Sequence, residues 1–143
     1  MAAAMETRLV DILAAVTREL VDSLEADACG ISRVIGDMLI LITEHTTDGS
    51  TLQLGQGYLV SDFPETAVVL RTREPRAVTV GEPDADPAEE ALLRELGYGA
   101  LLMLPLDFEG EVWGLVEIYR SEARAYSADE MRRGAELLAS RLG

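Results

Sequence analysis

The chain has 143 residues, of which 26 are acidic and 12 are basic, so its formal net charge at pH 7 is −14. This length predicts one domain, 1–143, whose core needs neither a disulfide nor a metal for stability. The acidic surface disfavours nucleic acid and anionic membranes as partners, since both bind proteins largely through their phosphate groups.

The cysteine content and the N-terminal sequence bear on the compartment. A single cysteine, Cys29, has no partner for an internal disulfide, which is typical of the reducing cytosol. Apolar runs are shorter than a membrane span, and acids interrupt the first segment, so we expect neither a secretory signal nor a membrane helix. The sequence predicts a cytoplasmic protein. All basic residues are arginine, a bias that favours a bacterial, GC-rich source.

Residues 5–24 show apolar side chains at spacings of three and four, which predicts an amphipathic helix within residues 1–25. A narrower set has the four-three-four spacing of a coiled-coil seam, and it consists of Met5, Leu9, Ile12 and Val16. We expect one stripe of this helix to lie on the domain's own sheet and the other to meet a second helix.

Strands are predicted next. Gly36 and Asp37 separate two short apolar runs between Ala28 and His45, and a glycine opening a two-residue loop favours a type II′ hairpin. The second run, Met38–Ile42, is wholly apolar, which predicts a strand covered on both faces. A third, more exposed strand is predicted over residues 51–58.

The middle of the chain predicts two short helices around a small strand. The first helix begins at a Ser61 or Asp62 cap and ends at residues 73–75, and the strand follows at residues 76–80. The second helix begins after the cap residue Asp86. Pro87 is its first residue, Glu89 lies three after the cap and Gly97 closes it.

A second hairpin and a helix complete the chain. Residues 101–106 lack polar alternation, as expected for a central strand, and Gly110 lies in the turn after it. The return strand alternates Val112, Gly114, Val116 and Ile118 against Trp113, Leu115, Glu117 and Tyr119. A capping box, Ser127 with Glu130, begins a helix over residues 127–142. This order predicts an α+β fold with an antiparallel sheet of about five to six strands. The terminal helices cover one face, and the middle helices and loops cover the other.

Three segments together resemble the GAF domain family over nearly the whole chain. They are "VLRTREPRAVTV", "GALLMLPLDFEGEVWGLVEIYR" and "AYSADEMRRGAELLASRLG". The resemblance implies a profilin-like fold and a regulatory module of a signalling protein rather than an enzyme. GAF domains bind small molecules between the sheet and the middle helices, or they dimerise through the terminal helices, and the fold does not decide between these roles.

The residues weigh against several GAF subclasses. The phosphodiesterase-type cyclic-nucleotide motif begins with asparagine, and this chain has none. Many bilin-binding relatives carry histidine directly after the attachment cysteine, whereas Gly30 follows Cys29. One cysteine also lacks the partner that thiol-exchange enzymes need. His45 is the candidate axial ligand for haem, because on a regular strand it shares a face with Leu39 and Leu41. The sequence names no cofactor.

Aromatic and methionine side chains are the candidate ligand contacts. The residues predicted to line a ligand cavity are Tyr58, Phe63, Tyr98, Met103 and Tyr119. The residues predicted to form a homodimer interface are Met5, Leu9, Ile12, Val16, Leu138 and Leu142. No catalytic or metal-ligating set is visible, and the acid pairs Glu89–Glu90 and Asp129–Glu130 are interpreted as support for helix N-termini. The main alternative is a dimerisation module with no ligand, and a haem sensor or an enzyme ranks below both.

Overall fold

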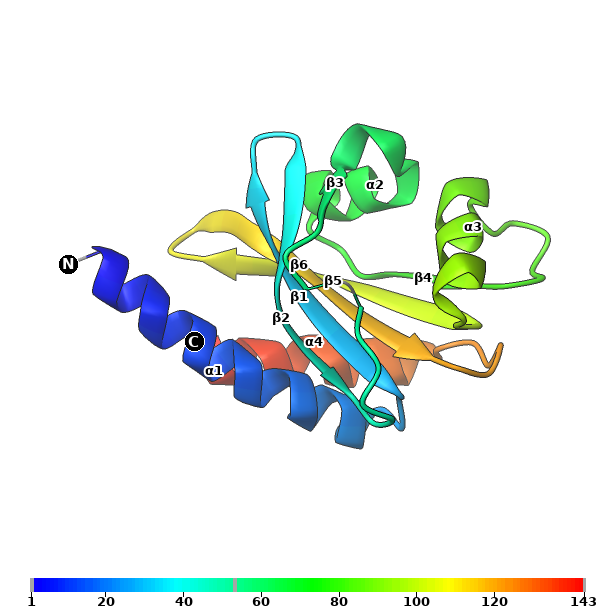
Figure 1. The fold of residues 1–143 in the computed structure, drawn as a ribbon, viewed down its shortest axis with the longest axis horizontal. Coiled ribbons are helices and arrows are strands. Elements are labelled where there is room, and N and C mark those ends of the chain that lie inside the picture. Colours follow the sequence, from blue (N-terminus) through cyan, green and yellow to red (C-terminus); the bar gives the residue numbers. More distant parts are fainter. Residues whose placement is uncertain (1, 53, 143) are drawn as a thin grey trace.

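The computed structural model describes residues 2–52 and 54–142, with side chains described from residue 8 onward. Its centre is a six-stranded antiparallel sheet in the order β3-β2-β1-β6-β5-β4. Figure 1 shows α1 (Ala2–Ser23) and α4 (Ala128–Leu142) together on one face of this sheet, and α2 (Pro64–Thr72) and α3 (Pro87–Leu96) on the other. The predicted α+β architecture is confirmed.

The strands form the predicted hairpins, and one predicted strand is shorter than expected. Their bounds are β1 (Ala28–Ile35), β2 (Met38–Thr46), β3 (Gly57–Leu59), β4 (Arg76–Thr79), β5 (Ala100–Phe108) and β6 (Glu111–Arg120). Gly36 has φ +60° whereas Asp37 is outside the positive-φ region, as a type II′ turn requires. The strand predicted over residues 51–58 begins only at Gly57. Before it, the Glu44 carboxylate accepts hydrogen bonds from the Thr51 hydroxyl and the Leu52 amide, so a side chain replaces strand pairing there.

Strand β5 is buried on both faces, as its apolar sequence predicts. Leu102, Leu104 and Leu106 belong to a core cluster between the sheet and the terminal helices. Leu101 and Met103 belong to a second cluster between the sheet and α2 and α3. The sheet therefore supports two separate cores, and its apolar residues divide between them.

Two β-bulges move side chains to faces that regular alternation does not predict. In the β5–β6 pair, Leu106 faces Gly114 and Asp107 faces Val112, so Trp113 is the extra residue and joins the terminal-helix core. In the β1–β2 pair the extra residue is Ile42, and His45 therefore pairs with Cys29. Because Cys29 belongs to the terminal-helix core, His45 lies on that side of the sheet and not on the face predicted for haem.

The start of α2 also differs from the prediction. A short 3₁₀ turn, η1 (Val60–Asp62), precedes it, and Phe63 is the N-cap residue with no side-chain cap hydrogen bond. Ser61 does not cap the helix, because its hydroxyl donates to Asp37 at 2.7 Å. This contact joins the segment before α2 to the β1–β2 hairpin.

A buried arginine connects β6 to both terminal helices. Arg120 is 1% exposed, and its side chain donates to the Leu24 carbonyl at 2.7 Å, just after α1. It also pairs with Glu130 in the first turn of α4 and stacks over the Tyr126 ring at 3.9 Å. Glu130 forms the predicted capping box with Ser127. The ends of α1 and α4 are thus held by one side chain at the end of a central strand.

The predicted dimer seam needs correction. Leu9 and Val16 are 3% and 0% exposed, and with Leu138 they pack into the core beneath the chain's own sheet. Leu142 is half-buried against the same cluster. Ile12 is 41% exposed and is the one seam position that presents its side chain to solvent among those described. The side chain of Met5 lies outside the described residues. The stripe is apolar because it faces the sheet.

Candidate ligand-binding site

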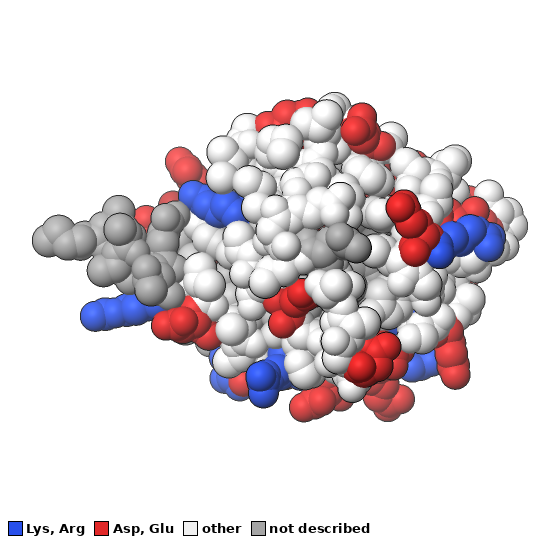
Figure 2. Space-filling view, viewed as in Figure 1, with Lys and Arg blue, Asp and Glu red and all other residues white. Residues whose placement is uncertain are grey.

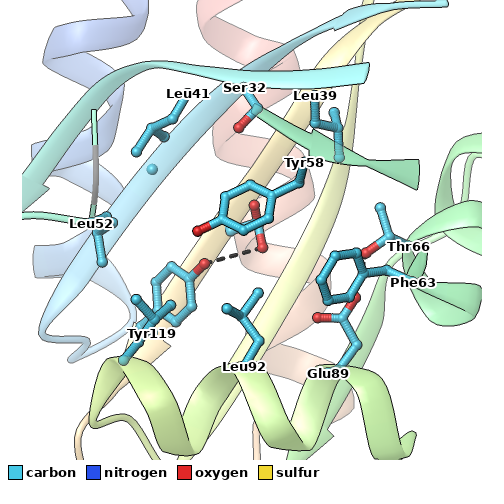
Figure 3. Close-up of a pocket in the computed structure, with 13 residues that line it drawn as sticks. Ser32, Leu39, Leu41, Leu52, Tyr58, Phe63, Thr66, Glu89, Leu92 and Tyr119 are labelled. Carbon is cyan, nitrogen blue, oxygen red and sulfur yellow. Dashed lines mark hydrogen bonds between the residues drawn. The ribbon is translucent and has the colours of Figure 1, made fainter. Parts of the chain in front are cut away.

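A cavity lies between the sheet and helices α2 and α3, and residues from six elements line it (Figure 3). The cavity volume is about 30 Å³, and the wider hollow of about 480 Å³ includes space that is open to solvent. The walls are aromatic and aliphatic, formed by Tyr58, Phe63, Tyr119, Leu39, Leu41, Leu52, Leu92 and Leu96. The polar lining consists of Ser32, Thr66, Glu89 and Glu117. Apolar walls with few polar groups are typical of small-molecule sites.

The floor of the cavity depends on Gly30 in β1. A Cβ atom at this position would lie 2.9 Å from Leu41 Cδ1 and 3.1 Å from Leu52 Cδ1. A larger residue would therefore push two cavity walls apart. Glycine allows these leucines to close over β1 and keeps the cavity open above them.

Glu117 comes from β6, where it lies between Leu115 and Tyr119 on the cavity face. Burial, with a smaller contribution from the charge of nearby Glu89, raises the pKa of this carboxyl from 4.5 to about 8. The Tyr119 hydroxyl donates a 3.1 Å hydrogen bond to Glu117, which acts in the opposite direction. The carboxyl therefore keeps its proton at neutral pH.

Glu89 comes from α3 and is 1% exposed. Its backbone amide donates to the Asp86 cap at 3.1 Å, as predicted, but its side chain turns to the cavity, where the Thr66 hydroxyl of α2 donates to it. Burial raises the pKa of Glu89 to about 7. The Thr66 hydrogen bond opposes this shift, while the charges of Asp86 and Glu65 add to it. The carboxyl thus joins the two helices that cover the cavity.

The structure brings three of the five predicted cavity residues together. Tyr58, Phe63 and Tyr119 line the cavity, and the Tyr58 and Phe63 rings meet edge to face at 6.0 Å. Tyr98 lies behind the wall, with its ring 5.0 Å from that of Tyr119. Met103 is also behind the wall, where its sulfur lies 3.4 Å from the Thr66 hydroxyl. Both support cavity residues without lining the cavity.

Sequence reasoning missed Glu89 and Glu117 as cavity residues. For Glu117 a signal existed, because the predicted alternation of the return strand places it on the same face as Leu115 and Tyr119. Glu89 had a sufficient local explanation as the acid of a capping box. Its position in the cavity depends on Thr66, which comes from a different helix, and no local pattern reports that contact.

The thiol and the imidazole of the chain lie away from the cavity. Cys29 is completely buried in the terminal-helix core, and burial together with the charge of Glu117 raises the pKa of its thiol. His45 pairs with Cys29 on the same face of the sheet. Within residues 2–52 and 54–142, no cluster of three or more potential metal ligands occurs. None of the helices described there is long and apolar enough to span a bilayer.

Charged side chains on the outside do not form a single patch on the face that carries β2 and β3. Figure 2 shows acidic and arginine side chains around its edge and uncharged residues over much of its centre. Arginine is absent from the described lining of the cavity.

A family model described as GAF domain matches residues 8–143. No curated protein matches the chain.

Three solved structures show how similar the fold is. The blue-light absorbing form of the PixJ GAF domain from Thermosynechococcus elongatus is 19% identical, with a TM-score of 0.77 over 92% of this chain and 80% of that chain. The phycocyanobilin-bound GAF domain from a cyanobacterial phytochrome is 22% identical, with a TM-score of 0.78 over 99% and 86%. The chromophore binding domain of Stigmatella aurantiaca phytochrome P1 is 22% identical, with a TM-score of 0.70 over 89% and 50%. At these identities the likeness shows the fold.

Proposed function

This chain belongs to the GAF domain family, and we propose that it is a sensory or regulatory domain that binds a small organic ligand without a covalent bond. The ligand site is the cavity between the sheet and helices α2 and α3. The observation that carries the proposal is the placement of two carboxyl groups, Glu89 and Glu117, inside an otherwise aromatic and aliphatic hollow. Buried polar groups need partners, and a ligand supplies them where the protein does not.

The similar structures support a ligand in this fold but not its covalent attachment here. One of them is described as phycocyanobilin-bound, and another is described as a chromophore binding domain. In this chain the single thiol, Cys29, belongs to the core on the opposite side of the sheet. A ligand between the sheet and α2 and α3 therefore has no thiol to react with, and we propose non-covalent binding.

Strand β6 provides a route from the cavity to the terminal helices. Glu117 and Tyr119 line the cavity, and Arg120 follows them directly with its contacts to Leu24 and Glu130. A ligand that prefers one position of β6 also prefers one arrangement of the ends of α1 and α4. We propose that the signal is such a shift in population between two arrangements.

The output of this shift is proposed to be a change at a homodimer interface within a bacterial signalling protein. Because Leu9 and Val16 are buried in this chain's own core, we propose that the interface uses the outer surfaces of the terminal helices. Among the residues of α1 whose side chains are described, Ile12 is the exposed large apolar residue. The interface is therefore tested by substitution of Ile12 rather than of the buried residues Leu9 and Val16.

A second function is favoured by the size of the enclosed space. About 30 Å³ holds one or two water molecules, so the side chains nearly fill the cavity in this conformation. A domain of this kind can act as an interaction module with no ligand. Binding of a ligand larger than water requires helices α2 and α3 to move away from the sheet.

A thermal-shift screen distinguishes the two functions, because a ligand specific for the folded state raises the melting temperature. We would screen a metabolite and nucleotide panel against the wild type, Leu92→Trp and Ala91→Trp. Leu92 lines the cavity, and tryptophan there closes the mouth, whereas Ala91 is exposed on the same helix. The proposal predicts a hit that Leu92→Trp loses and Ala91→Trp keeps. A panel with no hit, or hits that Leu92→Trp retains, favours the interaction module.

A further inference from the structure

We propose that the ligand is an organic cation, with a protonated amine, amidine or guanidine group that binds Glu89 and Glu117 and an apolar body that packs on the surrounding rings. This inference rests on the proposed function of the same cavity and adds the chemical class of its ligand. It depends on which hydrogen bonds the cavity leaves unmade and on which charges it contains.

The cavity has more acceptors than donors. Glu89 is 1% exposed, and among the described residues Thr66 is the one donor to its carboxyl group. Figure 3 shows that carboxyl group turned towards the cavity, so its second oxygen faces the ligand space. Glu117 likewise receives one described donor, the Tyr119 hydroxyl at 3.1 Å. When it is ionised, each carboxylate therefore leaves one oxygen to accept from a donor that the ligand brings.

The charges in the cavity select the sign of the ligand. Among the described residues that line it there is no arginine, and the ionisable side chains are two glutamates and two tyrosines. At a pH above their raised pKa values, an anionic group placed there would meet two carboxylates with no opposite charge nearby, which is unfavourable at low dielectric. A cation supplies both the missing donors and the missing charge, and charge-assisted hydrogen bonds are the stronger kind.

The aromatic walls suit the rest of the ligand. Tyr58, Phe63 and Tyr119 line the same cavity as the two carboxyl groups, and aromatic faces attract cations as well as apolar groups. The cavity volume of about 30 Å³ is too small for a ring, so the apolar body of the ligand occupies space that opens when α2 and α3 move away from the sheet.

Protonation of the carboxyl groups makes the binding pH-dependent. The other ionisable groups that interact electrostatically with them are Glu65 of α2, Asp86 before α3, Tyr58 of β3 and Tyr119 of β6. Burial raises the pKa of Glu89 to about 7 and that of Glu117 to about 8. A bound cation must therefore displace protons at neutral pH, so its affinity rises as the pH increases from about 6 to about 9 and protons are released on binding.

Three probes of similar shape test the charge preference: benzamidine, which is cationic, benzamide, which is neutral, and benzoate, which is anionic. We would measure their affinities for the intact chain by isothermal titration calorimetry at about pH 6 and about pH 9. The inference predicts that benzamidine binds at least about tenfold more tightly than either analogue at the higher pH. Its affinity should fall at the lower pH.

Variants locate the preference. Glu117→Gln and Glu89→Gln keep the shape of the side chain and remove its charge, so each should reduce the preference for benzamidine. Glu95→Gln removes an exposed charge from the same helix as Glu89 and should leave the preference unchanged. If all three variants lost the preference for benzamidine equally, the overall charge of the protein would explain the preference and the inference would be overturned.

The wild-type affinities alone decide the matter if a variant fails to fold. Benzoate or benzamide binding as tightly as benzamidine, or no measurable binding of benzamidine, overturns the cation assignment. A neutral or anionic ligand that Leu92→Trp excludes would leave the proposed function intact and remove only this inference. If the screen also gives no ligand of any charge, both fail together.

Discussion

Replacing Glu117 by glutamine should make the protein more stable at alkaline pH and leave its stability nearly unchanged at acidic pH. The carboxyl is protonated in the fold up to a pKa of about 8, whereas the unfolded chain releases the proton near the ordinary value of 4.5. Between these values the folded state binds more protons than the unfolded state. The free energy of unfolding of the wild type therefore falls as the pH rises through this window and levels off above it.

The size of the effect follows from the shift. One pKa unit corresponds to about 1.4 kcal/mol, so the rise from 4.5 to about 8 sets an upper bound of about 5 kcal/mol. Because Glu117 keeps some contact with solvent at the cavity, we expect the wild type to lose about 3 kcal/mol of this. Glutamine carries no charge at any pH. Glu117→Gln should therefore exceed the wild type in stability by about 3 kcal/mol at about pH 9.

Urea denaturation at a series of pH values measures this difference. Glu111→Gln is the matched control, since Glu111 lies on the same strand and is exposed. Its stability should follow that of the wild type at every pH. If Glu117→Gln and the wild type gave parallel curves between about pH 5 and about pH 9, Glu117 would not be a buried carboxyl and the reasoning would be refuted.

Four further predictions concern the rest of the molecule. Arg120→Met should lower the free energy of unfolding by about 3 kcal/mol or more in urea denaturation, because it leaves Glu130 and several carbonyls without their buried donor. A decrease below about 1 kcal/mol would mean that these contacts add little to stability. Ile12→Glu should reduce the molar mass in light scattering with an unchanged melting temperature, whereas Leu9→Glu should unfold the domain because Leu9 is buried; an unchanged dimer in Ile12→Glu would exclude this face of α1. Cys29 should resist a thiol reagent in the folded protein and react in concentrated urea, since it is completely buried and its thiol pKa is raised. Rapid reaction of the folded protein would contradict the burial of Cys29 in the terminal-helix core. Gly30→Val should lower stability by about 1 to 3 kcal/mol in the same urea assay, because its side chain meets Leu41 and Leu52; an unchanged stability would show that these leucines move freely.

Much of the fold was predictable because it depends on local signals. The spacing of apolar residues before Leu24, the Gly36 turn and the Asp86 cap each specify an element without reference to distant residues. The apolar run of residues 101–106 also predicts correctly that its strand is covered on both sides. These signals determine the elements and the order in which they pack.

The bulges were not predictable from the pattern, because one extra residue in a strand changes only the pairing. The extra residues Ile42 and Trp113 reverse the faces predicted for their neighbours, and His45 moves to the terminal-helix side as a result. The stripe that contains Leu9 and Val16 shows a related limit. Apolar spacing indicates that a face is covered, but not whether its own sheet or a second copy covers it.

The candidate site contains residues that the sequence predicts and residues that it does not. Tyr58, Phe63 and Tyr119 were predictable from the positions of aromatic residues around the middle helices, since the family resemblance supplied the place of the cavity. Glu89 was not, because its capping position already explained an acid there and the contact with Thr66 joins two different helices. For Glu89, the capping pattern explained the acid and so concealed its place in the cavity.

The pKa values of Glu89 and Glu117 test the central claim most directly, because the cation preference and the pH-dependent stability both require two carboxyl groups that share one poorly hydrated cavity. The measurement is a ¹³C NMR titration of the glutamate carboxyl carbons, with Glu89→Gln and Glu117→Gln to assign the signals. We predict two coupled titrations with apparent pKa values of about 7 and about 8. Titration of every glutamate below about pH 5.5, the ordinary range for exposed carboxyl groups, would contradict the account.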